Sequence, residues 1–263
     1  MVEIFGKIIP PTIKMIKDKG YNIKIIQQCV QSQRETLSKF YETENISVTS
    51  GSQAVIARLP SLYLKNVNKP PEKIDVWLPE IGYKEHERSW FDAGFNIKQY
   101  ENLPCIDSLS ENTIVVVINP NNPTGKLHQQ QSLSSLLHKL ELCSGWLIVD
   151  EAFMDVIKPN QSIIHLTNNK HLFVLRSFGK FFGLAGIRIG FLSAHPYWLN
   201  KLNQISSPWE VNGPAQYIAE QALNDQGWQD DQQQELTSLS NKLEQLLAKT
   251  FLNTLKRDSS IDI

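Results

Sequence analysis

Five consecutive branched apolar residues, Ile114 to Ile118, constrain the fold of this 263-residue chain more than any other feature. Such a run predicts a strand that is buried on both faces, as in a parallel sheet covered by helices. A helical pattern follows, with leucines at positions 133, 136, 137 and 140 on one face, and residues 145–149 form the next apolar strand. Alternation of strand, helix and strand indicates an α/β fold, in which functional residues gather at the carboxyl ends of the strands.

Further elements are predicted along the chain. We expect strands at 46–49, 74–78, 172–175 and 187–192. Helices are expected over 23–41, 52–62 and 230–255, and three more are expected: one that follows Tyr83 and ends at about Ala93, one after Ala194 and one that begins at Pro214. The helix over 230–255 has a broad apolar stripe and is expected to pack against other parts of the fold. Residues 1–22 are expected to be irregular, because Pro10-Pro11 breaks any early helix.

Composition excludes several classes of protein. The chain has 26 basic and 27 acidic residues, so electrostatics give no case for binding nucleic acid or an anionic membrane. Its three cysteines and six histidines are scattered, which suggests neither a disulfide framework nor a metal site. The apolar runs are too short to span a bilayer, and the N-terminal residues lack the apolar core of a signal peptide. We therefore expect a soluble cytoplasmic protein.

The stretch from Leu172 to Ala194, LFVLRSFGKFFGLAGIRIGFLSA, contains the clearest chemical signal. Lys180 lies among aromatic residues and glycines, which are expected to desolvate it. Desolvation favours the neutral amine, the nucleophile that forms a Schiff base with an aldehyde. Ser177 and Arg188 supply a hydroxyl group and a planar cation, which together suit one phosphate group. An aldehyde and a phosphate are both present in pyridoxal phosphate (PLP).

Five residues in other segments are candidates for holding the same cofactor. Ser52 and Gln53 follow a predicted strand and begin a helix, and free backbone N–H groups at a helix N-terminus attract anions. Tyr83, just past a strand, could lie flat over an aromatic ring. Asp150, at the end of a buried strand, could pair with the pyridine nitrogen and keep it protonated, which makes the ring an electron sink. Asn122, in the turn NPNNPTG, could donate to the phenolate oxygen of the ring.

A nucleotide hydrolase is the main rival hypothesis. The segment LIVDEA resembles a Walker B strand, and Gly125-Lys126 and Gly179-Lys180 resemble the end of a P-loop. Neither Gly-Lys pair is followed by Ser or Thr, and neither has the required glycine five residues earlier. We therefore reject this hypothesis.

Four motifs in order, NPNNPTG, VDEAF, SFGKFFGLAGIRIGFL and SPWEVNGPA, resemble the fold-type I PLP enzymes of the aminotransferase superfamily. Within it, they are most similar to the threonine-phosphate decarboxylases of cobalamin biosynthesis, which are close relatives of histidinol-phosphate aminotransferases. The similarity runs from about Gln28 to about Trp228. It implies a mostly parallel central sheet flanked by helices, a homodimer, and PLP bound to Lys180. It also implies decarboxylation of L-threonine O-3-phosphate to (R)-1-amino-2-propanol phosphate.

On this basis we assign residues 1–45 to an N-terminal arm and helix, 46–210 to a PLP-binding large domain, and 211–263 to the start of a small domain. We expect the small domain to be incomplete, because the chain stops at Ile263 without the arginine that binds the substrate carboxylate in relatives. Arg257 does not match that motif. The N-terminal arm also lacks the relatives' Tyr-Pro segment, whose tyrosine reaches the neighbouring subunit's phosphate, and Gln27-Gln28-Cys29 offers no equivalent.

One further departure concerns Phe153, which stands where many aminotransferases have a tyrosine, so that Asn122 would bind the phenolate oxygen alone. Decarboxylase-like sequences often share this phenylalanine. Cofactor motifs do not determine which bond at the substrate α-carbon breaks, since the substrate-binding residues set that choice. Three hypotheses remain open: a threonine-phosphate decarboxylase, an aminotransferase acting on a phosphorylated amino acid, and a truncated, inactive protein that binds PLP or folds only in part.

Overall fold

The computed structural model describes residues 34–105, 108–207 and 210–258, with side chains up to residue 249. The chain forms two compact units, Met1–Leu223 and Asn224–Ile263. Residues 34–41 are helical, in agreement with the end of the helix predicted over 23–41. The irregular segment expected at 1–22, the residues Gln27-Gln28-Cys29 and the end of the chain at Ile263 lie outside the described residues.

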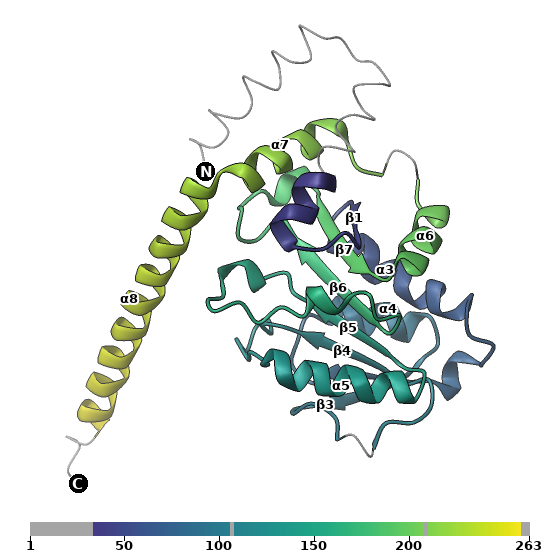
Figure 1. Ribbon diagram of the computed structural model, residues 1–263. Coiled ribbons are helices and arrows are strands. Elements are labelled where there is room, and N and C mark those ends of the chain that lie inside the picture. Colours follow the sequence, from purple (N-terminus) through teal and green to yellow (C-terminus); the bar gives the residue numbers. More distant parts are fainter. Residues whose placement is uncertain (1–33, 106–107, 208–209, 259–263) are drawn as a thin grey trace, which may run out of the picture. The chain divides into compact units, whose positions relative to one another are not determined.

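A seven-stranded sheet forms the centre of the first unit, in the order β1-β7-β6-β5-β4-β2-β3 (Figure 1). Neighbouring strands are parallel from β6 to β3, whereas β7 pairs antiparallel with both β6 and β1. The prediction of a mostly parallel sheet is therefore confirmed. The strands are β1 (Ile46–Thr49), β2 (Asp75–Pro79), β3 (Asn96–Tyr100), β4 (Ile114–Ile118), β5 (Trp146–Asp150), β6 (Leu172–Ser177) and β7 (Gly190–Ala194).

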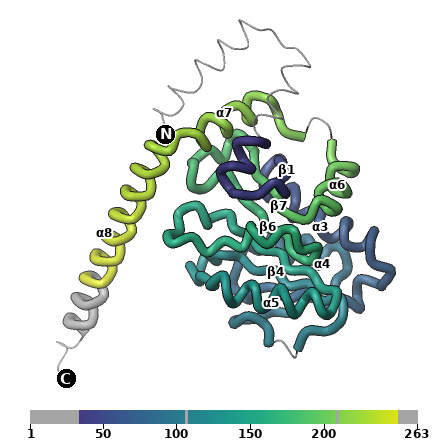
Figure 2. Tube along the Cα trace, in the orientation of Figure 1, coloured from purple at the N-terminus to yellow at the C-terminus, as the bar shows by residue number. Residues whose placement is uncertain are grey.

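Helices cover both faces of this sheet. Figures 1 and 2 show α5 (Gln130–Leu142) in front of the sheet, with α3 (Ser52–Leu64) and α4 (Lys84–Asp92) behind it. The four leucines predicted on one face of α5 are all buried. The described part of the chain also contains helices α6 (Pro196–Ile205) and α7 (Gly213–Asn224).

Alternate strand residues belong to the two faces. Ile114 and Val116 of β4 join the core cluster formed with α3 and α4, as do Trp146 and Ile148 of β5. The residues between them are also completely buried and point to the opposite face, because successive side chains of a strand alternate. This two-sided burial explains the unbroken apolar runs of the central strands.

Strand β3 was not predicted from the sequence. Its residues, NIKQY, are largely polar and so resemble a loop. They can be polar because β3 lies at the edge of the sheet, where it pairs with β2. Tyr100 at its end is buried and donates a hydrogen bond from its hydroxyl group to the Val116 carbonyl oxygen, 2.7 Å away. This contact fixes the strand to the sheet.

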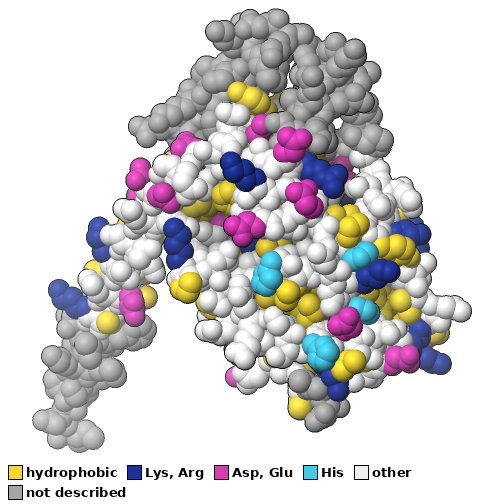
Figure 3. Space-filling model, viewed as in Figure 1, with side chains coloured by type: hydrophobic (Ala, Val, Ile, Leu, Met, Phe, Trp, Pro, Cys, Tyr) yellow, Lys and Arg dark blue, Asp and Glu magenta, His cyan; other side chains and the backbone are white. Residues whose placement is uncertain are grey.

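The second unit contains α8 (Gln226–Asp258), which is 33 residues long. The predicted helix is confirmed, but the stripe expected to pack is exposed where the structure describes side chains: Leu239, Leu243, Leu246 and Leu247 are 49–62% exposed. Apolar side chains are visible on the surface of this helix in Figure 3. Among the described residues, no helix has both the length and the apolar character needed to cross a membrane.

Candidate active site

A pocket lies where the carboxyl ends of β4, β5 and β6 meet the N-terminus of α3. Its cavity volume is about 140 Å³, and it opens to solvent. The pocket brings together all eight residues that the sequence singled out: Ser52, Gln53, Tyr83, Asn122, Asp150, Ser177, Lys180 and Arg188.

Strand alternation selects which side chains reach this pocket. In β5, Asp150 points to the same face of the sheet as Trp146 and Ile148, the face toward α3 and α4, and it lines the pocket. In β6, Ser177 points to the same face as Leu175, and it also lines the pocket. The carboxyl ends of two adjacent parallel strands thus deliver one acidic and one hydroxyl side chain to the same place.

The N-terminus of α3 forms an anion cradle from Gly51, Ser52 and Gln53. Gly51 precedes the helix with φ of 87°, and no side chain caps this helix end. The Arg188 guanidinium contacts Gly51 so closely that a Cβ atom there would lie 2.9 Å from Nη2. A Cβ on Gly190 would lie 2.6 Å from the Ser52 nitrogen. Both glycines are therefore needed for the close approach of Arg188 and β7 to the positive end of the helix.

Arg188 has no ion-pair partner within 4.0 Å among the described residues, so its charge is available to a ligand in the cradle. Its backbone adopts a left-handed conformation, with φ of 56°. This conformation ends the short 3-10 turn at Ala185–Ile187 just before β7 begins.

Asp150 forms the floor of the pocket and is 4% exposed. Its Oδ1 atom accepts a hydrogen bond from the Ala152 backbone N–H at 3.0 Å, and Oδ2 lies 2.9 Å from Nε2 of His86. His86 comes from α4, where it and Trp90 form the buried face of the helix. The sequence did not single out His86, although it follows Tyr83 by about one helical turn and so lies on the same side of α4.

Tyr83 lies at the rim, and its hydroxyl group donates to Oε1 of Gln53 at 3.3 Å. Gln53 in turn donates from Nε2 to Oε2 of Glu85 at 2.8 Å. Burial raises the pKa of Tyr83, as do the charges of Glu85 and Asp150, while Arg188 opposes the shift. The phenol is therefore protonated, and Tyr83 as a whole is 43% exposed, so its side chain is accessible to a flat ligand.

Lys180 also lines the pocket, and its Nζ atom lies 5.0 Å from the ring centroid of Phe153. The expectation that flanking aromatic residues desolvate this lysine is wrong, because its side chain is exposed. The neighbouring rings turn inward instead: Phe178 and Phe182 are buried and stack on each other with centroids 4.0 Å apart. Asn122 is also exposed at the edge of the pocket.

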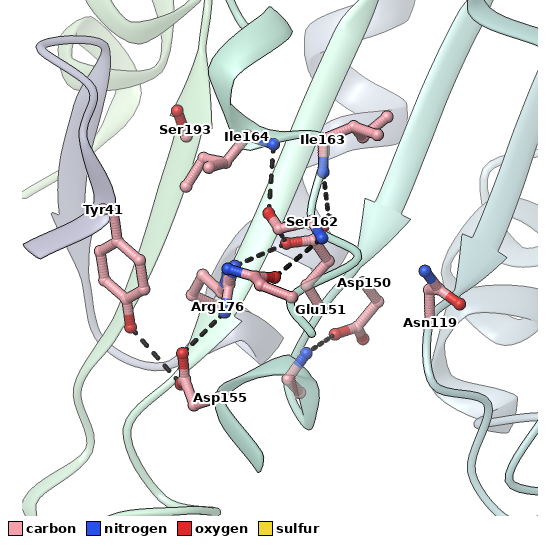
Figure 4. A network of polar contacts seen from close by, with 12 residues as sticks. Tyr41, Asn119, Asp150, Glu151, Asp155, Ser162, Ile163, Ile164, Arg176 and Ser193 are labelled. Atoms are coloured by element: carbon pink, nitrogen blue, oxygen red, sulfur yellow. Dashed lines mark hydrogen bonds and ion pairs between the residues drawn. The ribbon is translucent and has the colours of Figure 1, made fainter. Parts of the chain in front are cut away.

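Behind the pocket, on the other face of the strand ends, lies a buried ionic network (Figure 4). Arg176 of β6 binds Glu151 at 2.8 Å and Asp155 at 2.7 Å, and all three side chains are almost fully buried. Glu151 also accepts hydrogen bonds from Ser162 Oγ at 2.5 Å and the Ile163 N–H at 3.1 Å. Burial raises the pKa of both Glu151 and Asp155, with the Arg176 charge acting against it. The network ties β5 to β6 directly beside Asp150 and Ser177.

Glu210 gives the motif SPWEVNGPA a structural role. Its Oε1 atom accepts a hydrogen bond from Arg58 of α3 at 2.5 Å and another from Ser50 Oγ at 3.2 Å. Burial alone would raise the pKa of Glu210, but the hydrogen bond and charge of Arg58 outweigh it and lower the pKa. The ionised carboxylate thus fixes the residue that precedes the anion cradle. Among the described residues, no cluster of three or more metal-ligating side chains is present.

Comparison with known proteins places this site in a family. Residues 9–261 match the family described as aminotransferase class I and II. The chain is 38% identical over 213 residues to a threonine-phosphate decarboxylase from Pseudomonas aeruginosa, which covers 80% of this chain and 61% of the relative. It is also 37% identical over 221 residues to a histidinol-phosphate aminotransferase from Haemophilus influenzae, covering 80% of this chain and 57% of the relative. The chain belongs to the aminotransferase class I and II family, and it spans about three fifths of the length of these relatives.

Solved structures show the same fold. A histidinol-phosphate aminotransferase from Sinorhizobium meliloti, solved in complex with pyridoxal-5'-phosphate, superposes with a TM-score of 0.77 at 19% identity, covering 92% of this chain and 67% of that one. An L-threonine-O-3-phosphate decarboxylase from Porphyromonas gingivalis gives a TM-score of 0.63 at 21% identity, covering 74% of this chain and 61% of that one. The architecture is therefore that of fold-type I aminotransferases, as the sequence predicted.

Proposed function

We propose that this chain binds pyridoxal phosphate covalently through Lys180 and acts as a PLP-dependent enzyme on a phosphorylated amino acid. The observation that carries the proposal is the convergence of a lysine, a buried carboxylate and an uncapped helix N-terminus with Arg188 on one pocket. These groups match the three chemical parts of PLP: an aldehyde, a pyridine nitrogen and a phosphate.

The residues present fit the cofactor. The anion cradle combines a helix N-terminus that no side chain caps with the Arg188 guanidinium beside Gly51, and Ser177 and Arg188 can donate to a phosphate bound there. Asp150 can accept a hydrogen bond from the protonated pyridine nitrogen, because each of its oxygens retains a free lone pair after its contact with Ala152 or His86. Asn122 can donate to the phenolate oxygen, and Tyr83 can cover the ring. When bound, the cofactor supplies the electron sink that stabilises negative charge at the substrate α-carbon.

For the reaction, we propose decarboxylation of L-threonine O-3-phosphate to (R)-1-amino-2-propanol phosphate, as in cobalamin biosynthesis. The 38% identity to a threonine-phosphate decarboxylase supports this choice. Phe153, which lines the pocket, also favours it, since decarboxylase-like sequences often have phenylalanine at this position. The alternative is amino transfer to or from a phosphorylated amino acid, which the 37% identity to a histidinol-phosphate aminotransferase favours. We further propose a cytoplasmic homodimer, on the resemblance to the family.

The first experiment tests the cofactor site. Purified protein is mixed with PLP, and the visible absorbance band of the bound cofactor is recorded before and after reduction with borohydride, followed by peptide mapping. We expect a reducible band and a modified peptide that contains Lys180. Lys180→Ala should lose the band and all turnover, whereas Lys126→Ala, at another Gly-Lys pair outside the pocket-lining set, should retain both. A Lys180→Ala protein that turns over at a comparable rate contradicts the proposal.

A second experiment separates the two reactions. With L-threonine O-3-phosphate alone, a decarboxylase releases carbon dioxide and the phosphorylated amino alcohol. An aminotransferase instead consumes a phosphorylated amino compound only when a keto acid is added. Turnover that depends strictly on a keto acid would replace the decarboxylase assignment with the aminotransferase one.

A further inference from the structure

His86 is a buried polar side chain that contacts Asp150 from a separate element, α4. The imidazole is 1% exposed, and its Nε2 atom lies 2.9 Å from Oδ2 of Asp150. Its ring also lies edge-on to that of Tyr83, with centroids 6.3 Å apart and planes at 83°. His86 therefore contacts both the residue that would pair with the pyridine nitrogen, Asp150, and the residue that would cover the ring, Tyr83.

The surroundings of the other ring nitrogen of His86, Nδ1, indicate which of the two nitrogens carries the proton. Nδ1 is buried and has no hydrogen-bond partner in the described part of the chain. A buried N–H without an acceptor is expensive, and a charged one is more so, whereas an unpaired lone pair on a neutral ring costs less. The proton is therefore best placed on Nε2, where it points at the Asp150 carboxylate.

Two N–H donors then hold Asp150, one on each oxygen: His86 on Oδ2 and the Ala152 backbone on Oδ1. The backbone donor cannot be changed by a side-chain substitution and comes from the residue two positions later in the chain. The His86 donor comes from α4, a separate element. His86 thus links the Asp150 carboxylate to α4, the helix whose N-cap residue is Tyr83.

We propose that His86 is a positioning residue for the cofactor site: in its neutral form, with the proton on Nε2, it orients Asp150 toward the pyridine nitrogen and supports the ring of Tyr83. The cofactor part of this inference rests on the proposed function. The tautomer and the bond to Asp150 do not, and they can be measured in the protein without PLP.

The first test is nuclear magnetic resonance of the full chain labelled with ¹⁵N-histidine, without cofactor. The His86 signal is assigned as the one lost in His86→Gln. We expect a protonated Nε2 and an unprotonated Nδ1, as the contact to Asp150 and the unpartnered Nδ1 require. A proton on Nδ1, or an imidazolium at pH 7, would overturn the inference whether or not the chain binds PLP.

The second test compares PLP affinity and the pH dependence of the bound cofactor's absorbance. His86→Phe keeps the ring but removes the donor, and should weaken PLP binding about ten- to hundredfold, the range for a hydrogen bond to a charged group. His86→Gln, whose amide can still donate, should restore part of that loss and keep the absorbance profile closer to that of the unmodified protein.

The matched control is Trp90→Phe, which alters the same buried face of α4 one turn further along. It should lower the unfolding midpoint without changing PLP affinity more than about twofold. If Trp90→Phe weakens PLP binding as much as His86→Phe, or if His86→Phe leaves binding unchanged, His86 is a packing residue and the inference fails. If the unmodified chain does not bind PLP, the proposed function fails, and the tautomer measurement alone decides whether His86 orients Asp150.

Discussion

The buried network around Arg176 allows a prediction with a worked magnitude. Arg176→Met fills a similar volume but leaves Glu151 and Asp155 in the protein interior without their cation. Removing one partner of a buried ion pair typically costs about 3–5 kcal/mol. Domains are commonly stable by only about 5–15 kcal/mol, so the loss would be a large share of the total. With an m value of about 2–3 kcal/mol/M, the urea midpoint should fall by about 1–2.5 M.

This loss should depend on pH. Burial already raises the pKa of Glu151 and of Asp155 in the folded protein, and removing Arg176 takes away the charge that opposes the rise. A carboxyl with a higher pKa in the folded than in the unfolded state stabilises the fold at low pH, and this contribution is lost as the pH rises through the folded pKa. The stability deficit of Arg176→Met should therefore be largest at pH 8 and smaller at pH 5.

The assay is reversible urea unfolding followed by tryptophan fluorescence at pH 5, 6, 7 and 8. Arg188→Met is the matched control, because Arg188 is exposed and has no ion pair among the described residues. The free energy of unfolding of this variant should differ from that of the unmodified protein by less than about 0.5 kcal/mol. Adding Glu151→Gln and Asp155→Asn to Arg176→Met should recover part of the loss. A deficit below about 1 kcal/mol, or one that is the same at pH 5 and pH 8, would refute the reasoning.

Two further substitutions test the anion cradle. Arg188→Met should weaken binding of PLP about ten- to hundredfold in an absorbance titration, because a charge-assisted contact to the phosphate is lost, and unchanged affinity would remove Arg188 from the site. Gly190→Ala should cost about 1–3 kcal/mol and also weaken PLP binding, since its Cβ atom would meet the Ser52 nitrogen, the Gly51 carbonyl carbon and the Arg176 oxygen within 3.0 Å. Gly186→Ala, where a Cβ meets nothing within 4 Å, is the control, and equal losses at the two glycines would contradict the argument.

Local patterns predicted much of this fold. The apolar runs of β4, β5 and β6 and the leucine face of α5 each carry their own periodicity, so a single segment is enough to assign them. The candidate residues of the pocket were found in the same way, because they follow strands at positions where parallel sheets build sites. Strand β3 was missed since an edge strand needs little apolar character.

Contacts between distant segments could not be predicted. His86 looks like any polar residue of a charged helix, and only the packing of α4 against the end of β5 brings it to Asp150. The partner of Glu151 depends on the register between β5 and β6, which places Arg176 beside it. The orientation of the rings near Lys180 likewise depends on the core beneath them, which is why the expected desolvation of the lysine was wrong.

The adjacent carboxyls of Asp150 and Glu151 serve opposite faces, the first lining the pocket and the second joining the ionic network. Because a strand alternates its side chains, deleting one residue in β5 would bring Glu151 to the position of Asp150 and Ala152 to that of Glu151. Inserting one residue would instead bring Asp150 to the position of Glu151 and Val149 to the floor of the pocket. Either change would leave the pocket without its aspartate. A single substitution in β5 leaves this alternation unchanged, whereas a change in the length of the strand does not. The site therefore requires a fixed number of residues in the strand that supports it.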